Sequence, residues 1–327
     1  MVTIIIPVYQ VSAYVERCIL SVMDQDYDAI ECIIVDDATQ DDSIEQCERL
    51  IERYNGPILF KILHHQYNRG LSAARNTGTD AASGDYLYYL DSDDEITTDC
   101  IEKLMAYAVS YPEAEMILGN HQAISISGNS IGVSNIASGM LSREMFIPLF
   151  QSYLLPRYAW NKLWKHSFIN EHHLSFREGV LFEDHLWTFY VLKVMQKLYY
   201  CNNITYHYYS RSGSITTMYC NHSAGLSFIT IYDEILHNLS HGQEKLELSR
   251  YVDGFCDRYV TFKKDIPAYT ALMKEYRRLS RQHRCYETCL KLDSALVLGN
   301  VPFGQRLTTL VRELKYKVIS YNKRKRK

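Results

Sequence analysis

Four carboxylates crowd together within five residues at the end of an apolar run. In GDYLYYLDSDDE, residues 84 to 95, Asp91, Asp93, Asp94 and Glu95 follow a stretch that is typical of a buried strand. Such hard oxygen ligands suit Mg²⁺ or Mn²⁺, which commonly take one or two protein carboxylates and fill their other positions with water and phosphate oxygens. The alternative is that Asp91 and Asp94 cap the following turn, and a D-x-D motif alone leaves both interpretations open.

Two further groups with chemical potential follow other apolar runs. Asp36 and Asp37 come directly after residues 30 to 35, and Tyr9 comes shortly after residues 2 to 6. A carboxylate accepts hydrogen bonds, and an aromatic ring offers a stacking face. Against these functions stand ordinary rim packing for Tyr9 and a helix or turn cap for Asp36.

The elements that must position these groups alternate between strand and helix. The apolar patterns predict helices at 14–25, 71–82 and 99–110, with a further one carrying Ile44, Cys47, Leu50 and Ile51, and strands at 2–6, 30–35, 59–63, 85–90 and 116–118. The first 120 residues therefore predict an α/β fold, an open and mostly parallel Rossmann-like sheet with helices on both faces. Ligands of such sheets bind beyond the carboxyl ends of the strands, where the acidic pairs and Tyr9 are expected.

The pattern changes after residue 120. QAISISGNSIGVSN alternates around a Gly-Asn turn and predicts an antiparallel hairpin, followed by a mixed region rich in Trp and Tyr. We expect one catalytic unit over 1–218, with halves 1–120 and 121–218, and a helical C-terminal appendage over 219–327.

Composition narrows the class of protein. The formal charge of -3 implies no general attraction to nucleic acid, and nine cysteines without CxxC pairs favour a reducing compartment. With neither a signal peptide nor a membrane span, a cytoplasmic protein is expected. Residues 311–327 carry eight Lys/Arg against one Glu on an apolar helical stripe, which predicts peripheral contact with an anionic membrane; a solvated tail is the alternative.

Four motifs occur in a recognisable order: PVY at 7–9, VDD at 35–37, NRGLSAARNTG at 68–78 and YLDSDD at 89–94. Together they resemble the inverting family 2 nucleotide-sugar glycosyltransferases, whose catalytic domain has the GT-A fold. The resemblance spans roughly residues 2 to 218. It implies a metal-dependent transfer of one sugar from a nucleoside diphosphate, UDP in the first place, to a hydroxyl of a glycan or a lipid-linked acceptor in surface polysaccharide synthesis.

The resemblance also implies which residues bind the donor. Asp93 would be the main ligand of Mn²⁺ or Mg²⁺, with Asp91 assisting. The nucleotide sugar would contact Pro7 and Tyr9 beside the base, Asp36 as an acceptor from the base, Arg75 near the diphosphate, and Asp91 with Ser92. The alternative for Arg75 is a salt bridge with Asp80 or Asp85.

Downstream, WNKLWKHSFI (160–169) and FREGVLFEDHLWTFY (176–190) also resemble the family. The second motif contains a Glu-Asp pair, and Asp184 is the position expected to act as catalytic base, with Glu183 beside it. Both carboxylates also suit the first turn of a helix. A weaker expectation is an acceptor contact for Trp160, to which core packing is the more common alternative for a large aromatic side chain. Arg211 and Ser214 are weaker expectations in a late loop over the diphosphate.

Two positions depart from the family pattern. Ala38 occupies a position where relatives usually have glycine, and Gln10 replaces a common asparagine. Because alanine tolerates a positive φ less well than glycine, a different loop path is expected here.

Two other classes of function stay open on the residues alone. A nucleotidyltransferase making a sugar nucleotide would also use an α/β sheet and a carboxylate-bound Mg²⁺, but it would ordinarily have a glycine-rich loop after the first strand, where this chain has PVYQVSAY. A catalytically silent sugar-nucleotide-binding protein would need neither Asp93 nor Asp184.

Overall fold

The computed structural model describes residues 1–125, 130–131, 136–210 and 222–238. The chain separates into two compact units, Met1–Met218 and Tyr219–Lys327. The described part of the second unit is the helix α8, His222–Asn238. That the first unit is the catalytic domain and the second an appendage stays a prediction.

The first unit begins with the expected alternation of strands and helices. The helices are α1 (Val15–Met23), α2 (Ser43–Arg53) and α3 (Leu71–Asp80), and the strands are β1 (Val2–Val8), β2 (Ile30–Asp36), β3 (Leu59–His64) and β4 (Tyr86–Tyr89). All four strands are parallel and lie in the order β3-β2-β1-β4, so Ile5 of β1 is paired with Ile33 on one side and Tyr89 on the other.

Beyond β4 the sheet becomes mixed. It continues through β9 (Lys162–Lys165), β6 (Met116–Ile124), β10 (Lys197–Tyr209) and β5 (Glu95–Ile96), while β7 (Ser130–Ile131) pairs with β6 and β8 (Gly139–Ser142) with β10. Within the described residues, β1, β2, β3, β4, β6 and β10 run in one direction and the other four strands run against them. The predicted α/β class with a mostly parallel sheet is confirmed.

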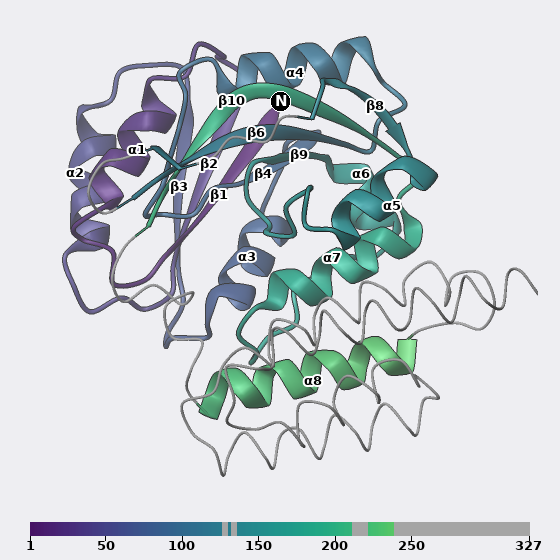
Figure 1. Cartoon of the computed structure of the whole chain (residues 1–327). Helices are drawn as coiled ribbons and strands as arrows, with labels where there is room; N and C mark the ends of the chain where they lie inside the picture. Colours follow the sequence, from purple (N-terminus) through teal and green to yellow (C-terminus); the bar gives the residue numbers. More distant parts are fainter. Residues whose placement is uncertain (126–129, 132–135, 211–221, 239–327) are drawn as a thin grey trace, which may run out of the picture. The chain divides into compact units, whose positions relative to one another are not determined.

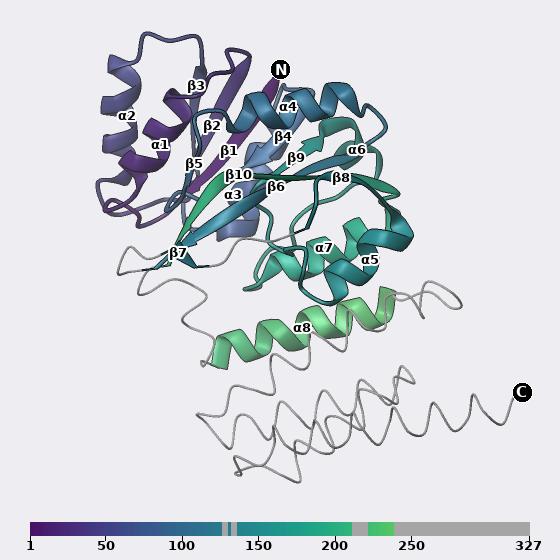
Figure 2. The same ribbon diagram turned by 45° about the horizontal axis from the view of Figure 1, so that its top comes forward.

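Helices cover both faces of this sheet (Figures 1 and 2). Alternate side chains of a strand point to opposite faces. Ile4 and Ile6 of β1 therefore share a buried cluster with α1, α2 and α4 (Cys100–Ser110). Ile33 and Val35 of β2 pack against Ala74 of α3 on the other face. There Gly78 permits close contact, since a Cβ at that position would lie 2.4 Å from Ile5 Cγ2.

Three more helices belong to the second half of this unit: α5 (Arg143–Gln151), α6 (His166–Glu171) and α7 (Glu183–Val194). The predicted hairpin after residue 120 is confirmed, because Ala123 and Ile124 of β6 pair antiparallel with Ile131 and Ser130 of β7. Its Gly-Asn turn lies outside the described residues.

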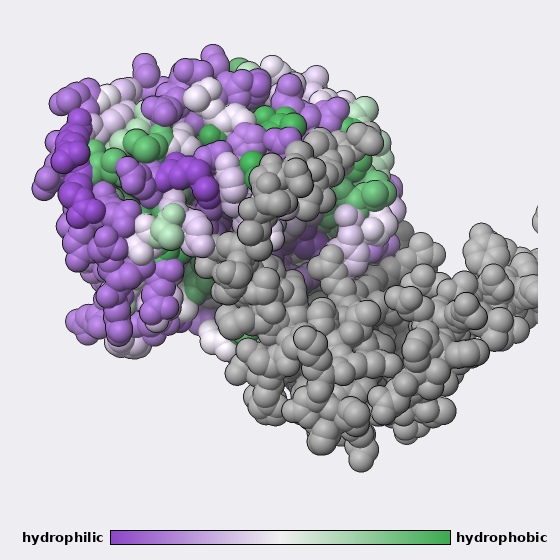
Figure 3. Space-filling view, turned by 60° about the vertical axis from the view of Figure 1, so that its left-hand side comes forward, coloured by the Kyte–Doolittle hydropathy of each residue, from purple (hydrophilic) through white to green (hydrophobic). Residues whose placement is uncertain are grey.

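The outer surfaces of α1 and α2 agree with their amphipathic patterns. The face turned forward in Figure 3 is mostly hydrophilic, with small apolar patches. The cysteines in the described residues are buried and free, as expected for small core side chains: Cys18, Cys32, Cys47, Cys100 and Cys201. No helix within the described ranges is long and apolar enough to cross a membrane. Residues 311–327 lie outside those ranges, so their contact with a membrane stays a prediction.

Candidate active site

The carboxyl ends of the parallel strands bring the candidate groups to one edge of the sheet. β1 and β2 end side by side at Val8 and Asp36, and the Asp37 N–H donates to the Val8 carbonyl at 3.0 Å. The acidic segment follows β4, which pairs with the other side of β1. Tyr9, the Asp36-Asp37 pair and the DSDD segment therefore follow three neighbouring strands.

Of the residues expected to contact the nucleotide base, only some are accessible to a ligand. Tyr9 is 40% exposed, so its ring is available for stacking. Pro7 is buried within β1, where it pairs with Val35. It could therefore only lie under a bound base and offers no exposed surface beside it. Asp36 accepts hydrogen bonds from the Thr39 N–H and from His64 Nδ1, both at 2.9 Å. Since a carboxylate has about four acceptor positions, Asp36 keeps capacity for a further donor.

The loop around Ala38 keeps the left-handed conformation despite the missing glycine. Ala38 has φ 56° and Gln10, in the facing loop, has φ 52°. The two loops are joined because the Gln10 N–H donates to Thr39 Oγ1 at 2.8 Å. Ala38 therefore adopts the positive φ that alanine tolerates less well than glycine, and a loop path different from that of other family members stays a prediction.

This strained alanine leads to a stability prediction. We expect Ala38→Gly to raise the free energy of unfolding by about 0.5–1 kcal/mol, because the left-handed conformation costs an L-residue roughly 1–2 kcal/mol and glycine's extra chain entropy offsets part of that gain. Ala106→Gly, on the exposed side of α4, is the matched control and should lower it by about 1 kcal/mol. Chemical denaturation measures both; a fall in stability for Ala38→Gly would contradict the strain.

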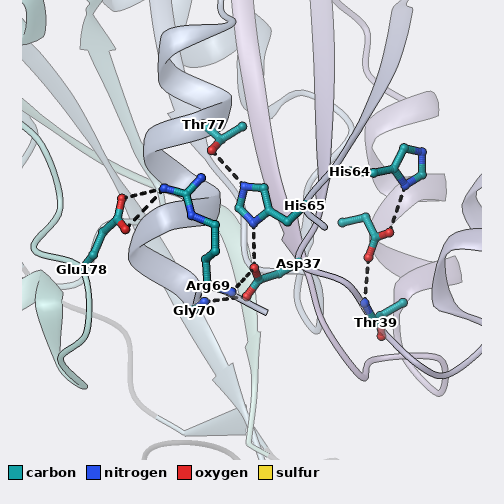
Figure 4. Close-up of polar contacts among 9 residues, drawn as sticks. Asp37, Thr39, His64, His65, Arg69, Gly70, Thr77 and Glu178 are labelled. Carbon is teal, nitrogen blue, oxygen red and sulfur yellow. Dashed lines mark hydrogen bonds and ion pairs between the residues drawn. The ribbon is translucent and has the colours of Figure 1, made fainter. Parts of the chain in front are cut away.

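Asp37 organises the entry to α3 (Figure 4). Its carboxylate accepts from the backbone N–H groups of Arg69 and Gly70, each at 2.7 Å, and from His65 Nδ1 at 2.7 Å. His65 Nε2 lies 2.9 Å from Thr77 Oγ1, in the second turn of α3. His65 was not among the residues predicted from the sequence, since a histidine beyond a strand end carries no signal without its partners.

The DSDD segment is neutralised by partners from distant parts of the chain. Arg75 of α3 forms an ion pair with Asp91 at 2.7 Å. Asp94 is buried and accepts from the Tyr206 hydroxyl at 2.7 Å and from the Tyr209 N–H at 2.8 Å. Burial, followed by the charges of Asp93 and Asp91, raises the pKa of Asp94 well above its usual value. Asp94 is therefore a structural acceptor for β10.

Arg17 of α1 supports the same segment from the other side. Its Nη2 donates to the backbone carbonyl of Asp93 at 2.6 Å, and its guanidinium carbon lies 3.6 Å from the centroid of the Tyr209 ring. The Tyr209 hydroxyl in turn donates to Glu95 at 2.6 Å. These contacts hold the backbone of the predicted metal-binding segment without using the Asp93 carboxylate.

Arg75 joins the acidic segment to the start of α7. It is 2% exposed, and its Nη1 donates to Glu183 Oε1 at 2.5 Å while Nη2 bonds Asp91. The anticipated alternative partners, Asp80 and Asp85, are not the ones it pairs with. Burial raises the pKa of Asp91 even though Arg75 opposes that shift. Both terminal nitrogens of Arg75 thus serve carboxylates of the candidate site, which favours a positioning role over direct contact with a diphosphate.

Asp184 lies in the first turn of α7, as the sequence predicts. The preceding Phe182 has a left-handed φ of 64°, and the His185 N–H donates to Asp184 Oδ1 at 2.8 Å. Burial, and then the neighbouring Glu183 carboxylate, raise the pKa of Asp184 to about 7, against the opposing effect of Arg75. A carboxylate with a pKa near neutrality suits a general base, because it can accept a proton without being too weak a base.

Trp160 lies in an aromatic stack. It is 5% exposed, with Tyr158 on one side at a centroid distance of 3.8 Å and Tyr206 at 4.3 Å. This burial gives Trp160 a packing role and does not support the expected acceptor contact. Lys162, also buried, donates to the Tyr158 carbonyl, and burial lowers the pKa of Lys162 to about 7, against the attraction of Asp184.

Of the remaining expected site residues, Ser92 is buried in the acidic segment, and Arg211 and Ser214 lie outside the described residues. Within the described ranges, no three His, Cys, Asp or Glu side chains are grouped to hold a metal ion by themselves. Asp91 and Asp93 nevertheless fit Mn²⁺ or Mg²⁺, because both are partly exposed carboxylates and a donor diphosphate and water would supply the other ligands.

Comparison with known proteins places this geometry in a family. The sequence model described as Glycosyl transferase family 2 matches residues 3–181. Glycosyltransferase GlyA of Streptococcus pneumoniae is 32% identical over 228 residues, which cover 67% of this chain and 32% of GlyA. The chain thus spans about a third of GlyA. The putative glycosyltransferase EpsH of Bacillus subtilis is 28% identical over 335 residues, covering 98% of this chain and 93% of EpsH.

Solved structures agree on the fold. S. aureus TarS (1–349) in complex with UDP-GlcNAc superposes with a TM-score of 0.70 at 16% identity, covering 90% of this chain and 83% of that chain. The mannosyltransferase PcManGT from Pyrobaculum calidifontis, in complex with GDP-Man and Mn²⁺, has a TM-score of 0.55 at 14% identity and covers 91% of this chain and 86% of that chain. The sheet with its flanking helices is thus the GT-A fold that the four motifs implied.

Proposed function

The chain belongs to glycosyl transferase family 2, and on that premise we propose that it transfers one sugar from a nucleoside diphosphate, with inversion, to a hydroxyl of a glycan or glycolipid. Its enzyme class is glycosyltransferase, which replaces the nucleotidyltransferase alternative. A role in bacterial surface polysaccharide synthesis, UDP as the nucleotide and a divalent metal are the finer parts of the proposal.

One observation carries the mechanism: Arg75 bonds Asp91 and Glu183 at the same time. The predicted metal-binding segment and the predicted base, which lie about ninety residues apart in the sequence, are therefore joined through one buried guanidinium. Donor diphosphate at Asp91 and Asp93 and acceptor hydroxyl at Asp184 would then meet at one place, as a direct displacement at the anomeric carbon requires.

In this proposal each residue has one task. Asp184 takes the proton from the acceptor hydroxyl as that oxygen attacks the anomeric carbon. Glu183 is instead held by Arg75, which bonds its Oε1. Asp93 and Asp91 would hold Mn²⁺ or Mg²⁺, which when bound stabilises the charge on the departing diphosphate.

The nucleotide follows from the base pocket. Tyr9 offers a stacking face and Asp36 an acceptor-only carboxylate, which matches the N–H of a uracil ring. UDP is therefore our first choice. The glycan or lipid-linked acceptor and the cytoplasmic location with its membrane contact remain predictions from the sequence.

Ligand-induced stabilisation tests the proposal directly. Thermal unfolding is followed with UDP, GDP, UDP-sugars and GDP-mannose, each with and without Mn²⁺. We expect a UDP ligand with Mn²⁺ to stabilise the protein, by about 2.7 kcal/mol when its concentration is 100 times its Kd. Stabilisation by guanine nucleotides alone would show that the donor is a GDP-sugar and not a UDP-sugar, and the glycosyltransferase assignment would stand. No response to any nucleotide with metal would refute donor binding.

A further inference from the structure

The segment between α6 and α7 leads to Asp184, and one side chain of α3, that of Asn76, is hydrogen-bonded to the middle of this segment. Asn76 Nδ2 donates to the carbonyl of Phe176 at 2.9 Å, and the Phe176 N–H donates to Asn76 Oδ1 at 2.8 Å. The two residues are 100 positions apart. A side-chain amide supplies one donor and one acceptor in a plane, so it can pair with both backbone groups of a single residue, as an adjoining strand would.

This pair of hydrogen bonds limits how the segment can move. Buried backbone N–H and C=O groups must be paired, and within the described residues the Phe176 pair finds both partners on Asn76. A single hydrogen bond would leave Phe176 free to rotate about it. Two bonds fix both the position and the direction of the chain at this point.

The fixed position of Phe176 also affects α7, because the Phe176 ring contacts that helix. The ring is stacked on Trp187 of α7 at a centroid distance of 4.8 Å and an interplanar angle of 13°, and it meets Tyr89 at the end of β4 edge-on at 5.3 Å. Trp187 lies three residues after Asp184, nearly one helical turn, so both residues belong to the same side of α7. The placement of Phe176 therefore bears on the turn that carries Asp184.

Two ion pairs accompany this clamp along the same part of the chain. Arg69, just before α3, reaches Glu178 at 3.2 Å, and Arg75 reaches Glu183 at 2.5 Å. Figure 4 shows Arg69 extending toward Glu178 while the backbone N–H groups of Arg69 and Gly70 are held by Asp37. The first pair is exposed and contributes little, as surface pairs do. The Asn76–Phe176 hydrogen bonds are thus accompanied by one weak, exposed ion pair and one buried ion pair.

We infer that Asn76 is a positioning residue for Asp184: by clamping the backbone of Phe176 it sets the start of α7, so that the Asp184 carboxylate reaches the acceptor hydroxyl. The inference rests on the proposed function. It adds a residue that touches neither donor nor acceptor and acts from the donor-side helix on the acceptor-side base.

Steady-state kinetics of the full chain tests this role. For Asn76→Ala we expect kcat for sugar transfer to fall about 10- to 100-fold, since a displacement of about 1 Å at a catalytic group can cost that much. The Kd for UDP with Mn²⁺ should stay within about twofold, because the donor contacts are unchanged. Asn76→Asp keeps the acceptor for the Phe176 N–H and loses the donor, so its kcat should be intermediate.

Asn55→Ala is the matched control. It removes the same amide from an exposed site, where the side chain donates to the carbonyl of Arg53 two residues away, and kcat should stay at the wild-type level. Thermal melting of every variant checks folding at the assay temperature. If Asn76→Ala does not fold, Asn76→Asp carries the same comparison.

A double-mutant cycle separates positioning from general stability. If Asn76 acts through Asp184, Asn76→Ala should lower kcat much less in an Asp184→Asn background than in the wild type, because the misplaced base is already inactive. Equal fold losses in both backgrounds, or an unchanged kcat for Asn76→Ala, would overturn the inference. Failure of the proposed function looks different, since the wild-type chain itself would then transfer no sugar.

Discussion

Replacing Asp184 with asparagine is expected to slow sugar transfer about 10²–10⁴-fold, the usual contribution of a general base, while the Kd for UDP with Mn²⁺ stays nearly unchanged. Asparagine retains the shape of the side chain and an oxygen for the His185 N–H, so α7 should begin as before. Single-turnover transfer and donor titration measure the two quantities separately. Asp80→Asn, an exposed change near the end of α3, is the control and should leave both unchanged.

The pH profile gives a second measure of the same group. Because the pKa of Asp184 is raised to about 7, its basic form increases as the pH rises through that value, and kcat/KM should rise with it. The profile of kcat should begin to rise at lower pH, since a bound cation favours the carboxylate. The Asp184→Asn variant should not show this rise of kcat/KM and kcat with pH.

Near-normal transfer by Asp184→Asn would contradict the assignment and require another base. The structure makes the nearest substitutes unsuitable. Glu183 is bound to Arg75, and both oxygens of Asp94 accept hydrogen bonds from β10. Mutating Glu183 or Asp94 would break a buried contact, so a loss of stability would accompany any loss of transfer.

Asp93→Ala should abolish the metal-dependent part of donor binding and leave the fold intact. The bond from Arg17 goes to the backbone carbonyl of Asp93, which alanine retains, so the segment should keep its path. In thermal unfolding, wild type should gain about 2.7 kcal/mol at ligand concentrations 100 times the Kd, and the variant should gain almost nothing from Mn²⁺ with UDP.

Asp94→Ala is the matched control for this experiment. It removes the neighbouring carboxylate but leaves the Tyr206 hydroxyl and the Tyr209 N–H without their acceptor, which should cost about 1–3 kcal/mol of stability for each buried group. The two variants should thus separate ligand binding from folding. If Asp93→Ala binds UDP with Mn²⁺ as tightly as wild type, Asp93 is not the metal ligand.

The candidate site was only partly predictable from the residues. Asp184 occupies the first turn of α7 and the DSDD segment follows β4, both as expected from local pattern and family resemblance. Trp160 shows where that approach ends: its motif left both an acceptor contact and core packing open, and the stack with Tyr158 and Tyr206 buries it. Whether an aromatic side chain faces solvent depends on the neighbours that other strands bring to it.

The alternation of strands and helices, and the edge of the sheet where the carboxylates gather, could be predicted from the residues alone. Those features depend on periodicities of a few residues, and parallel strands place their carboxyl ends together whatever their exact order. The partners of these groups, in contrast, depend on the packing of distant segments. Arg75 pairs with Glu183 across 108 positions, Asp94 with Tyr206 across 112 and Asn76 with Phe176 across 100. Contacts at such separations depend on how α3, α7 and the segment before α7 pack against the sheet that contains β10, because the local pattern of a side chain carries no information about the distant segment that will face it.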